Sequence, residues 1–189
     1  MKKKITLLSV LVIVIVILSF SVYSYISINS LYPQTKQLSL NLGDETKYSG
    51  LAFKVVSNEL FSYDEFVVKC NNKIDTKFYT DSLNTNDLVF SVALINLKNN
   101  TNSSKTISLE NIVITSDAYS NGIDINAFSS LNKDISYINP TLEPQQEITV
   151  YLVYSMLKPQ FIPREKKLSN VSLKLMLSLY PEKIFINLK

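Results

Sequence analysis

The residue types that carry most enzyme chemistry are scarce in this chain. It contains no His, and its single cysteine is Cys70. These counts exclude a His-based catalytic triad, a zinc site built from Cys and His ligands, and an internal disulfide. We interpret Cys70 as a buried structural residue, and the alternative is a free thiol that cross-links to a partner.

One polar segment carries oxygen ligands of the kind that calcium prefers. Asp117, Asn121, Gly122 and Asp124 lie close together in the sequence. An EF-hand-type loop that began at Asp117 would have aromatic residues at its third and twelfth positions, where oxygen ligands are required. We therefore interpret the segment as a turn, with Asn121-Gly122 as the turn signal. The sequence predicts no metal site and no cofactor.

Three further groupings contain residue types suited to hydrolysis or to anion binding. Asp64 and Glu65 would need a distant carboxylate within roughly 5–10 Å in a cleft to share acid and base roles. A Ser–Lys dyad at Ser103-Ser104-Lys105 would need a desolvated lysine, and this lysine follows small polar residues. Arg164-Glu165-Lys166-Lys167 is expected to be a hydrated loop, the alternative being contact with anionic lipid or wall polymer. We expect no enzyme and no catalytic residue.

The segment from Phe61 to Asp81 interleaves aromatic and acidic residues and breaks the alternation around it. Aromatic anchors with polar neighbours are typical of protein interfaces. We expect an excursion or an extra hairpin here, and it is the candidate partner surface. The favoured alternative is an additional edge of the fold with the rings in the core. The rings concerned are Phe61, Tyr63, Phe66, Phe78 and Tyr79.

All the residues named above belong to the part of the chain that follows an apolar N-terminal segment. We call this part the body. Ile5 to Ile26 contains no charge, Pro or Gly, and its 22 residues form a helix of roughly 33 Å, close to the ~30 Å hydrocarbon core of a bilayer. The preceding Lys2, Lys3 and Lys4 favour a cytoplasmic N-terminus and a body outside the cytoplasm. The alternative is a signal peptide cleaved near Ser24, which would give a secreted protein.

The boundaries that follow are a cytoplasmic tip at residues 1–4, a transmembrane helix at 5–26, a linker at 27–37 and one extracytoplasmic domain at 38–189. The chain has 19 basic and 16 acidic residues, and removing the three lysines of the tip leaves 16 of each. A neutral body argues against nucleic-acid binding, which needs a basic face to hold phosphates.

Apolar residues alternate along many short runs of the body, which predicts β-strands. The run from Leu88 to Ile95 is apolar in both alternating sets, so we expect that strand to be covered on both faces. No amphipathic helix is expected after residue 35. The predicted fold is all-β, an antiparallel two-sheet sandwich of seven to nine strands. The predicted core between the sheets contains Phe53, Phe90, Val92, Leu152, Leu173, Leu175 and Leu177, and Leu179 continues the alternation of the last three.

Four segments in order carry a resemblance to a known family. They are Leu42-Gly43-Asp44-Glu45-Thr46 before the strand at 51–56, the run 88–96 followed by Lys98-Asn99-Asn100, the run 112–117 leading to Gly122, and Leu142-Glu143-Pro144-Gln145-Gln146 before the strand at 148–154. This order resembles the immunoglobulin-like extracytoplasmic domains of unknown function from Gram-positive bacteria.

The resemblance covers Leu38 to Leu179 and implies a fold and a location outside the cytoplasm. The family is similar in fold to the secreted mycobacterial immunoprotective antigen. Its last segment usually reads Leu-x-Pro-Gly, whereas Gln145 occupies the glycine position here. The family has no established activity, so the resemblance implies no catalytic residue.

The sequence as a whole predicts a membrane-anchored extracytoplasmic binding or interaction module that is not an enzyme. Its partner is expected to be a protein or a component of the cell envelope. The alternative is an accessory subunit of a membrane transporter or secretion system. A surface hydrolase ranks below both, because His is absent and no nucleophile or acid–base motif is recognisable.

The anchor hypothesis makes a direct prediction about the protein isolated from its native membrane. Because the segment from Ile5 to Ile26 lacks a convincing cleavage site, the mature chain should keep residues 1–30 and sediment with membranes. Mass spectrometry of the native protein measures this. A mature N-terminus at Tyr25, with release into the medium, would contradict the hypothesis.

Overall fold

The structure is a computed structural model. It describes residues 2–31, 35–71, 73–81, 83–116, 119–135, 138–161 and 170–189, with side chains from Val12 onward. The chain divides into two compact units, Met1–Lys36 and Gln37–Lys189. The two units are described separately below, and the second is called the body.

The first unit is dominated by one apolar helix, α1 (Lys2–Leu31). Its segment Val12–Leu31 has a mean hydropathy of 2.0, and none of it is buried. By length and composition this segment is able to cross a membrane, as an anchor or a signal sequence does. The helix continues five residues past the predicted end at Ile26, so only residues 32–35 separate it from the first strand.

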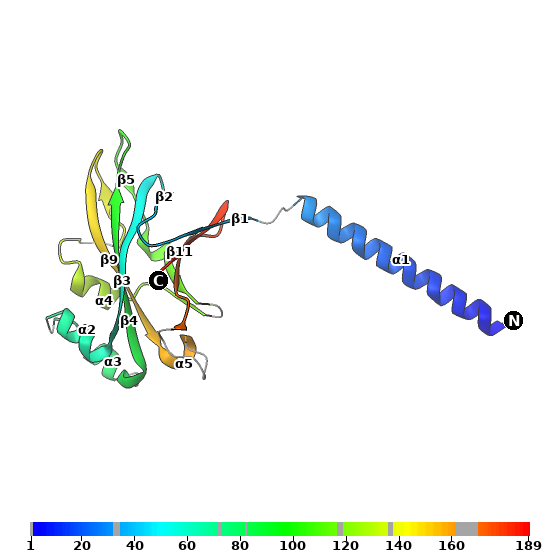
Figure 1. The fold of residues 1–189 in the computed structure, drawn as a ribbon, viewed down its shortest axis with the longest axis horizontal. Helices are drawn as coiled ribbons and strands as arrows, with labels where there is room; N and C mark the ends of the chain where they lie inside the picture. The colour runs from blue at the N-terminus through cyan, green and yellow to red at the C-terminus, as the bar shows by residue number, and fades with distance from the viewer. Residues whose placement is uncertain are drawn as a thin grey trace. The chain divides into compact units, whose positions relative to one another are not determined.

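A four-stranded sheet forms one layer of the body (Figure 1). Its strand order is β2-β3-β4-β9, and every neighbouring pair is antiparallel. β4 is apolar on both faces, which suits the centre of a sheet better than an edge. The strands are β2 (Glu45–Tyr48), β3 (Leu51–Ser62), β4 (Leu88–Lys98) and β9 (Glu147–Leu157).

A five-stranded sheet forms the second layer, in the order β1-β11-β10-β6-β7. A small two-stranded ribbon pairs β5 (Lys105–Thr106) with β8 (Thr141–Leu142). The strands of the second layer are β1 (Lys36–Leu40), β6 (Val113–Thr115), β7 (Ser120–Asn121), β10 (Lys174–Ser178) and β11 (Glu182–Asn187). The predicted antiparallel sandwich is confirmed.

The main core lies between the two sheets and follows the alternation of the sequence. Leu51, Phe53 and Val55 of β3 are fully buried there, as are Val150, Leu152 and Tyr154 of β9. The side chains contributed by the C-terminal segment are Val171, Leu173, Leu175, Leu177, Ile186 and Leu188. Because the side-chain period of a strand is two, these residues all point into the space between the two sheets. The residues between them in the sequence point to the opposite face of their own sheet.

Short helices interrupt the body, and the expectation of no amphipathic helix after residue 35 did not predict them. A capping box in which the Ser62 and Glu65 side chains bond each other's backbone begins α2, and the Asp124 side chain caps α4. Helices of four to seven residues are too short to show a 3.6-residue apolar period. They are α2 (Tyr63–Lys69), α3 (Lys77–Thr80), α4 (Ile125–Leu131) and α5 (Lys158–Phe161), with single 3-10 turns at Thr85–Asp87 and Leu109–Asn111.

A second core lies on the outer face of the four-stranded sheet. Phe90 and Val92 of β4 are buried there with Phe66 of α2 and Ala127 of α4, and not between the two sheets as predicted. Figure 1 shows α2, α3 and α4 on this side of the sheet, away from β10 and β11. The prediction that β4 is covered on both faces is confirmed, but helices provide one of the covers.

Two local features depart from the sequence pattern. Leu179 continues the alternation of β10, but it lies beyond the last residue of that strand and is 55% exposed. Asn121-Gly122 does not form the hairpin turn, because the β6–β7 turn closes earlier, through a hydrogen bond from the Ser116 N–H to the Tyr119 carbonyl. The Asn121 amide instead donates to the Ser155 carbonyl of β9 at 2.7 Å.

Gln145 keeps the turn that the family resemblance assigns to glycine. Its φ of 64° lies in the left-handed region that glycine adopts most readily. The turn is fixed against the loop after β4, because the Gln145 N–H donates to the Asn99 carbonyl at 2.8 Å and the Asn99 N–H donates to the Gln146 carbonyl at 2.9 Å. The hydrogen bonds therefore hold a conformation that glutamine alone does not favour.

The packing of β10 predicts how two adjacent substitutions differ. Leu175 is fully buried between the sheets, and Lys174 beside it is half-buried and points to the other face. Leu175→Ala should lower the free energy of unfolding by ~2–5 kcal/mol, and Lys174→Ala should change it little. Thermal unfolding of the full chain in detergent, followed by circular dichroism, measures both. Equal losses would mean that the register of β10 is wrong.

Candidate functional site

The predicted aromatic partner surface is divided by the structure into core and surface residues. Phe66 and Tyr79 are fully buried, which agrees with the favoured alternative that places the rings in the core. The Phe66 ring stacks on Phe90 with the ring centroids 4.1 Å apart, and the Tyr79 ring meets Phe90 edge-on at 5.4 Å. Offset-stacked and edge-on rings of this kind are typical of packed cores. These two rings attach α2 and α3 to the sheet.

Tyr79 also connects α3 to α4. Its hydroxyl donates to Asp124 Oδ1 at 2.8 Å, and the same oxygen accepts the N–H of Ala127 at 3.0 Å to cap α4. Burial, together with the charge of the Asp124 carboxylate, raises the pKa of Tyr79 well above its usual value. The hydroxyl therefore stays protonated and donates, which is a structural role.

The remaining three rings are more accessible. Phe61 and Tyr63 are half-buried, and Phe61 lies under the ammonium group of Lys69, 4.6 Å from the ring centroid. Phe78 on α3 is 60% exposed. Of the five predicted rings, only Phe78 presents most of its surface to solvent. The structure therefore brings the five residues into one region but leaves one exposed ring there.

The other candidate residues have structural surroundings. Cys70 is 2% exposed, as predicted, and its sulfur lies 3.2 Å from the Ser130 hydroxyl. Burial raises the pKa of the Cys70 thiol, which disfavours the reactive thiolate. Glu65 accepts hydrogen bonds from both the N–H and the hydroxyl of Ser62, and the backbone N–H lowers its pKa. Its role is to begin α2.

No catalytic or metal-binding cluster forms from the remaining candidates within the described residues. Ser104 donates to Glu143 Oε2 at 2.7 Å from the loop that precedes β5. Asp117 and the basic cluster at 164–167 lie outside the described residues. Among the His, Cys, Asp and Glu side chains that the structure describes, no three are grouped to hold a metal ion.

The outer face of the four-stranded sheet is only half covered, and its open half forms the candidate site. The strand register places Glu45, Lys54 and Asn96 in one row across β2, β3 and β4. The next row of the same face contains Lys98 and Glu147, opposite each other on β4 and β9. We call these five residues the polar face. They share a face because residues two apart on a strand point the same way.

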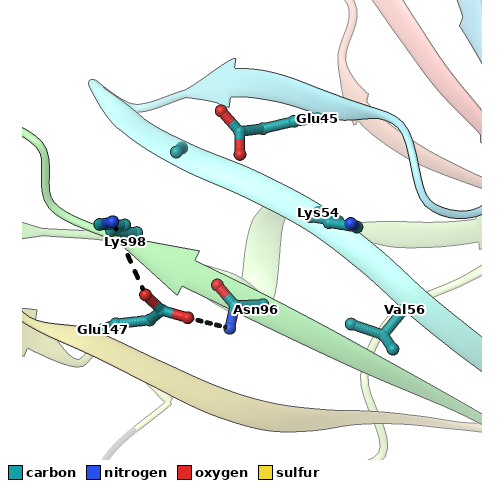
Figure 2. Close-up of a pocket in the computed structure, with 7 residues that line it drawn as sticks. Glu45, Lys54, Val56, Asn96, Lys98 and Glu147 are labelled. Carbon is teal, nitrogen blue, oxygen red and sulfur yellow. Dashed lines mark hydrogen bonds and ion pairs between the residues drawn. The ribbon is translucent and has the colours of Figure 1, made fainter.

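The polar face surrounds a hollow of about 330 Å³ (Figure 2). Ala52 lies in its lining among longer side chains, and Val56, which is 48% exposed, borders it. Glu147 is held by two contacts, a hydrogen bond from Asn96 Nδ2 at 2.7 Å and an ion pair with Lys98 Nζ at 3.9 Å. The short side chain of Ala52 leaves this space, and charged groups of both signs surround it.

The charges of the polar face contribute little to folding. The Lys98 and Glu147 side chains are 44% and 50% exposed. Exposed ion pairs of this kind stabilise proteins by about 0–1 kcal/mol, because water screens them and ordering long side chains costs entropy. These groups can therefore exchange partners without loss of the fold, as the residues of a binding surface must.

Sequence reasoning overlooks the polar face, although β4 carries a signal for it. Its outward residues are apolar at Leu88, Phe90 and Val92, and they become polar at Asn96 and Lys98. This change along one face marks the point where the helical cover ends. The prediction that both faces are covered from Leu88 to Ile95 did not use this change from apolar to polar residues.

Comparison with known families places the chain among its relatives. A family model described as a domain of unknown function, DUF5028, matches residues 31–184. The chain belongs to the DUF5028 family. The match covers the last residue of α1 and the body up to residue 184, and no curated protein matches the chain.

The solved structures similar to this DUF5028 chain include three bacterial proteins. A conserved hypothetical protein from Bacillus anthracis is 14% identical with a TM-score of 0.52, and the match covers 79% of this chain and 95% of that one. An uncharacterized β-sandwich protein from Clostridium difficile is 13% identical, with 82% and 97% covered and a TM-score of 0.49. The yjhA protein from Bacillus subtilis is 11% identical, with 79% and 99% covered and a TM-score of 0.48.

These comparisons support the family resemblance at its coarser level. The chain folds as a β-sandwich and belongs to a family of unknown function, and its fold is similar to that of the Bacillus anthracis protein. At this level of identity the likeness concerns the fold alone. The similarity to the mycobacterial antigen stays a prediction.

The two classes of aromatic residue predict opposite effects of the same substitution. Phe66→Ala should destabilise the body by ~3–5 kcal/mol, because it removes a fully buried ring stacked on Phe90. Phe78→Ala removes a ring that is 60% exposed and should cost far less. Denaturant titration of both full-length variants compares them. If the Phe78 variant loses as much stability as the Phe66 variant, the division into core and surface rings is wrong.

Proposed function

We propose that this DUF5028 protein is a membrane-anchored binding module whose body works outside the cytoplasm and catalyses no reaction. The apolar helix α1 supports the anchor, because no part of Val12–Leu31 is buried against protein. Exposing twenty residues of mean hydropathy 2.0 to water is unfavourable, whereas a bilayer accommodates them. The lysines at positions 2–4 favour retention of the N-terminus in the cytoplasm.

The observation that carries the binding function is the half-covered outer face of the four-stranded sheet. Helices α2 to α4 cover the end of this face that contains Phe90 and Val92. The other end is open and carries the polar face with its hollow. An open, polar hollow lacks the apolar enclosure that holds a small molecule, so it suits part of a larger partner.

The charges of the hollow indicate the chemistry of that partner. Lys54 and Lys98 supply positive charge, and Glu45 and Glu147 supply negative charge. A polypeptide surface that carries both positive and negative side chains can pair with all four groups. A surface whose charges are arranged differently would place like charges opposite each other and would be repelled. We therefore propose a protein partner, and the membrane anchor would raise the effective concentration of the module near partners at the same membrane.

The alternative proposal, an accessory subunit of a transporter or secretion system, uses the same anchor and the same face. The two differ in the identity of the partner. Recovery of the full chain with its partners from native membranes distinguishes them, because a subunit should co-purify with the other components of such a complex.

Charge reversal in the hollow tests the binding function. The double change Lys54→Glu and Lys98→Glu should lower recovery of co-purifying protein about tenfold, equivalent to ~1.4 kcal/mol of binding free energy, because it replaces attraction by repulsion. Ala52→Leu should also lower recovery, because it fills the hollow without changing charge. Quantitative mass spectrometry of material purified from native membranes measures both.

The matched control is Lys77→Glu with Lys133→Glu, which changes net charge equally at exposed positions on α3 and after α4. It should leave recovery unchanged, and all variants should keep the melting temperature of the parent chain. Equal recovery for the hollow variants and the control would reject the polar face as the binding surface.

A further inference from the structure

The turn between β10 and β11 exposes apolar side chains at one end of these two inner strands of the five-stranded sheet. Leu179 is 55% exposed and Tyr180 is 83% exposed. The turn has a defined shape, because the Ser178 hydroxyl donates to the Tyr180 carbonyl at 2.9 Å and the flanking strands pair from Ser178 with Ile184 onward. The two apolar side chains are therefore presented to solvent by an ordered hairpin.

This hairpin lies beside the strand through which the chain enters the body. β1 is the neighbour of β11 in the sheet. Asn187 Nδ2, at the end of β11, lies 3.1 Å from Asn41 Oδ1 and 3.4 Å from Ser39 Oγ, so the ends of the two strands coincide. The start of β1 therefore lies toward the β10–β11 turn, and Figure 1 shows β1 beside β11.

The covalent chain limits how far this end of the body can be from α1. The helix ends at Leu31 and β1 begins at Lys36, five residues later. A fully extended chain spans at most about 3.3–3.6 Å per residue, so the separation is at most about 18 Å. When α1 crosses a membrane, the start of β1 is therefore tethered within this distance of the helix end, which lies at the lipid headgroups.

The chemistry of the turn fits that environment. Tyr is enriched at the membrane–water interface, where its ring meets acyl chains and its hydroxyl meets water, and Leu partitions into the adjoining apolar region. Lys36 and Lys183 flank the turn and can contact phosphate groups, although Glu182 lies between Lys183 and Tyr180.

We propose that Leu179 and Tyr180 insert into the lipid interface of the membrane that α1 crosses. This inference rests on the proposed function, because it requires the anchor. The hairpin gives the body a second membrane contact and restricts its rotation about the linker. The polar face is built on the other sheet of the sandwich, so this contact leaves it open to a partner.

The absence of Trp from the chain permits a direct test. The full-length Tyr180→Trp variant carries one Trp, at the turn. It is reconstituted in vesicles of phosphatidylglycerol and phosphatidylcholine, with and without phosphatidylcholine brominated near the headgroup end of an acyl chain. We expect a blue-shifted emission maximum and loss of most of the intensity with the brominated lipid, because heavy-atom quenching requires contact.

The matched control is full-length Phe78→Trp, which places the single Trp at an exposed ring of α3, on the opposite side of the body from the turn (Figure 1). It should stay unquenched, and equal quenching of the two variants, or of neither, would overturn the inference. Flotation of the same vesicles tests the anchor separately. If the Tyr180→Trp variant floats and its fluorescence is not quenched, only the hairpin contact is rejected, whereas loss of flotation rejects the anchor and the inference with it.

Discussion

Strand β4 must be buried on both faces, and the arrangement of the body follows from this requirement. Every side chain from Leu88 to Ala93 is buried, including Ser91, whose hydroxyl donates to Asn58 of β3 at 2.7 Å. One face is covered by the five-stranded sheet and the other by α2, α3 and α4. A sandwich alone supplies only the first of these covers, so the segment between β3 and β4, together with α4, has to supply the second.

The extent of that second cover determines where the polar face lies. Phe66 and Tyr79 pack on Phe90 near one end of β4, and the helices that carry them are too short to reach the other end. There the outward residues of β4 become Asn96 and Lys98, which tolerate water. The outer face of β4 thus changes from apolar to polar along the strand. The apolar part requires the helical cover, and the polar part belongs to the candidate site.

The sequence was sufficient to predict the sandwich. A strand that is buried on one face alternates apolar and polar residues, and this pattern can be recognised within a few consecutive residues. The sequence was insufficient for α2, because a seven-residue helix with one fully buried side chain, Phe66, has no periodic pattern. Leu179 continues the alternation of β10 and yet is exposed, because the strand ends at Ser178. The capping box at Ser62 and Glu65 is the local signal in the sequence that indicates where α2 begins.

The candidate site was harder to predict, because it depends on which strands are neighbours. Glu45, Lys54, Asn96 and Glu147 come from four separate segments, and only the register of the sheet brings them into one surface. Their types are ordinary for exposed strand positions. The aromatic residues of α2 and α3 were conspicuous in the sequence, but two of them, Phe66 and Tyr79, are buried in the second core and do not form a surface.

The segment from Tyr63 to Asp87 has a consequence for the behaviour of the chain during folding. It joins two adjacent antiparallel strands that a turn of two to five residues normally connects. Until it docks, the apolar surface of Phe90, Val92 and Val153 is an open sheet face that a second chain could occupy. The segment thus competes with a second chain for this apolar sheet face. Because the segment is covalently attached, its effective concentration at the face is higher than that of any neighbouring molecule.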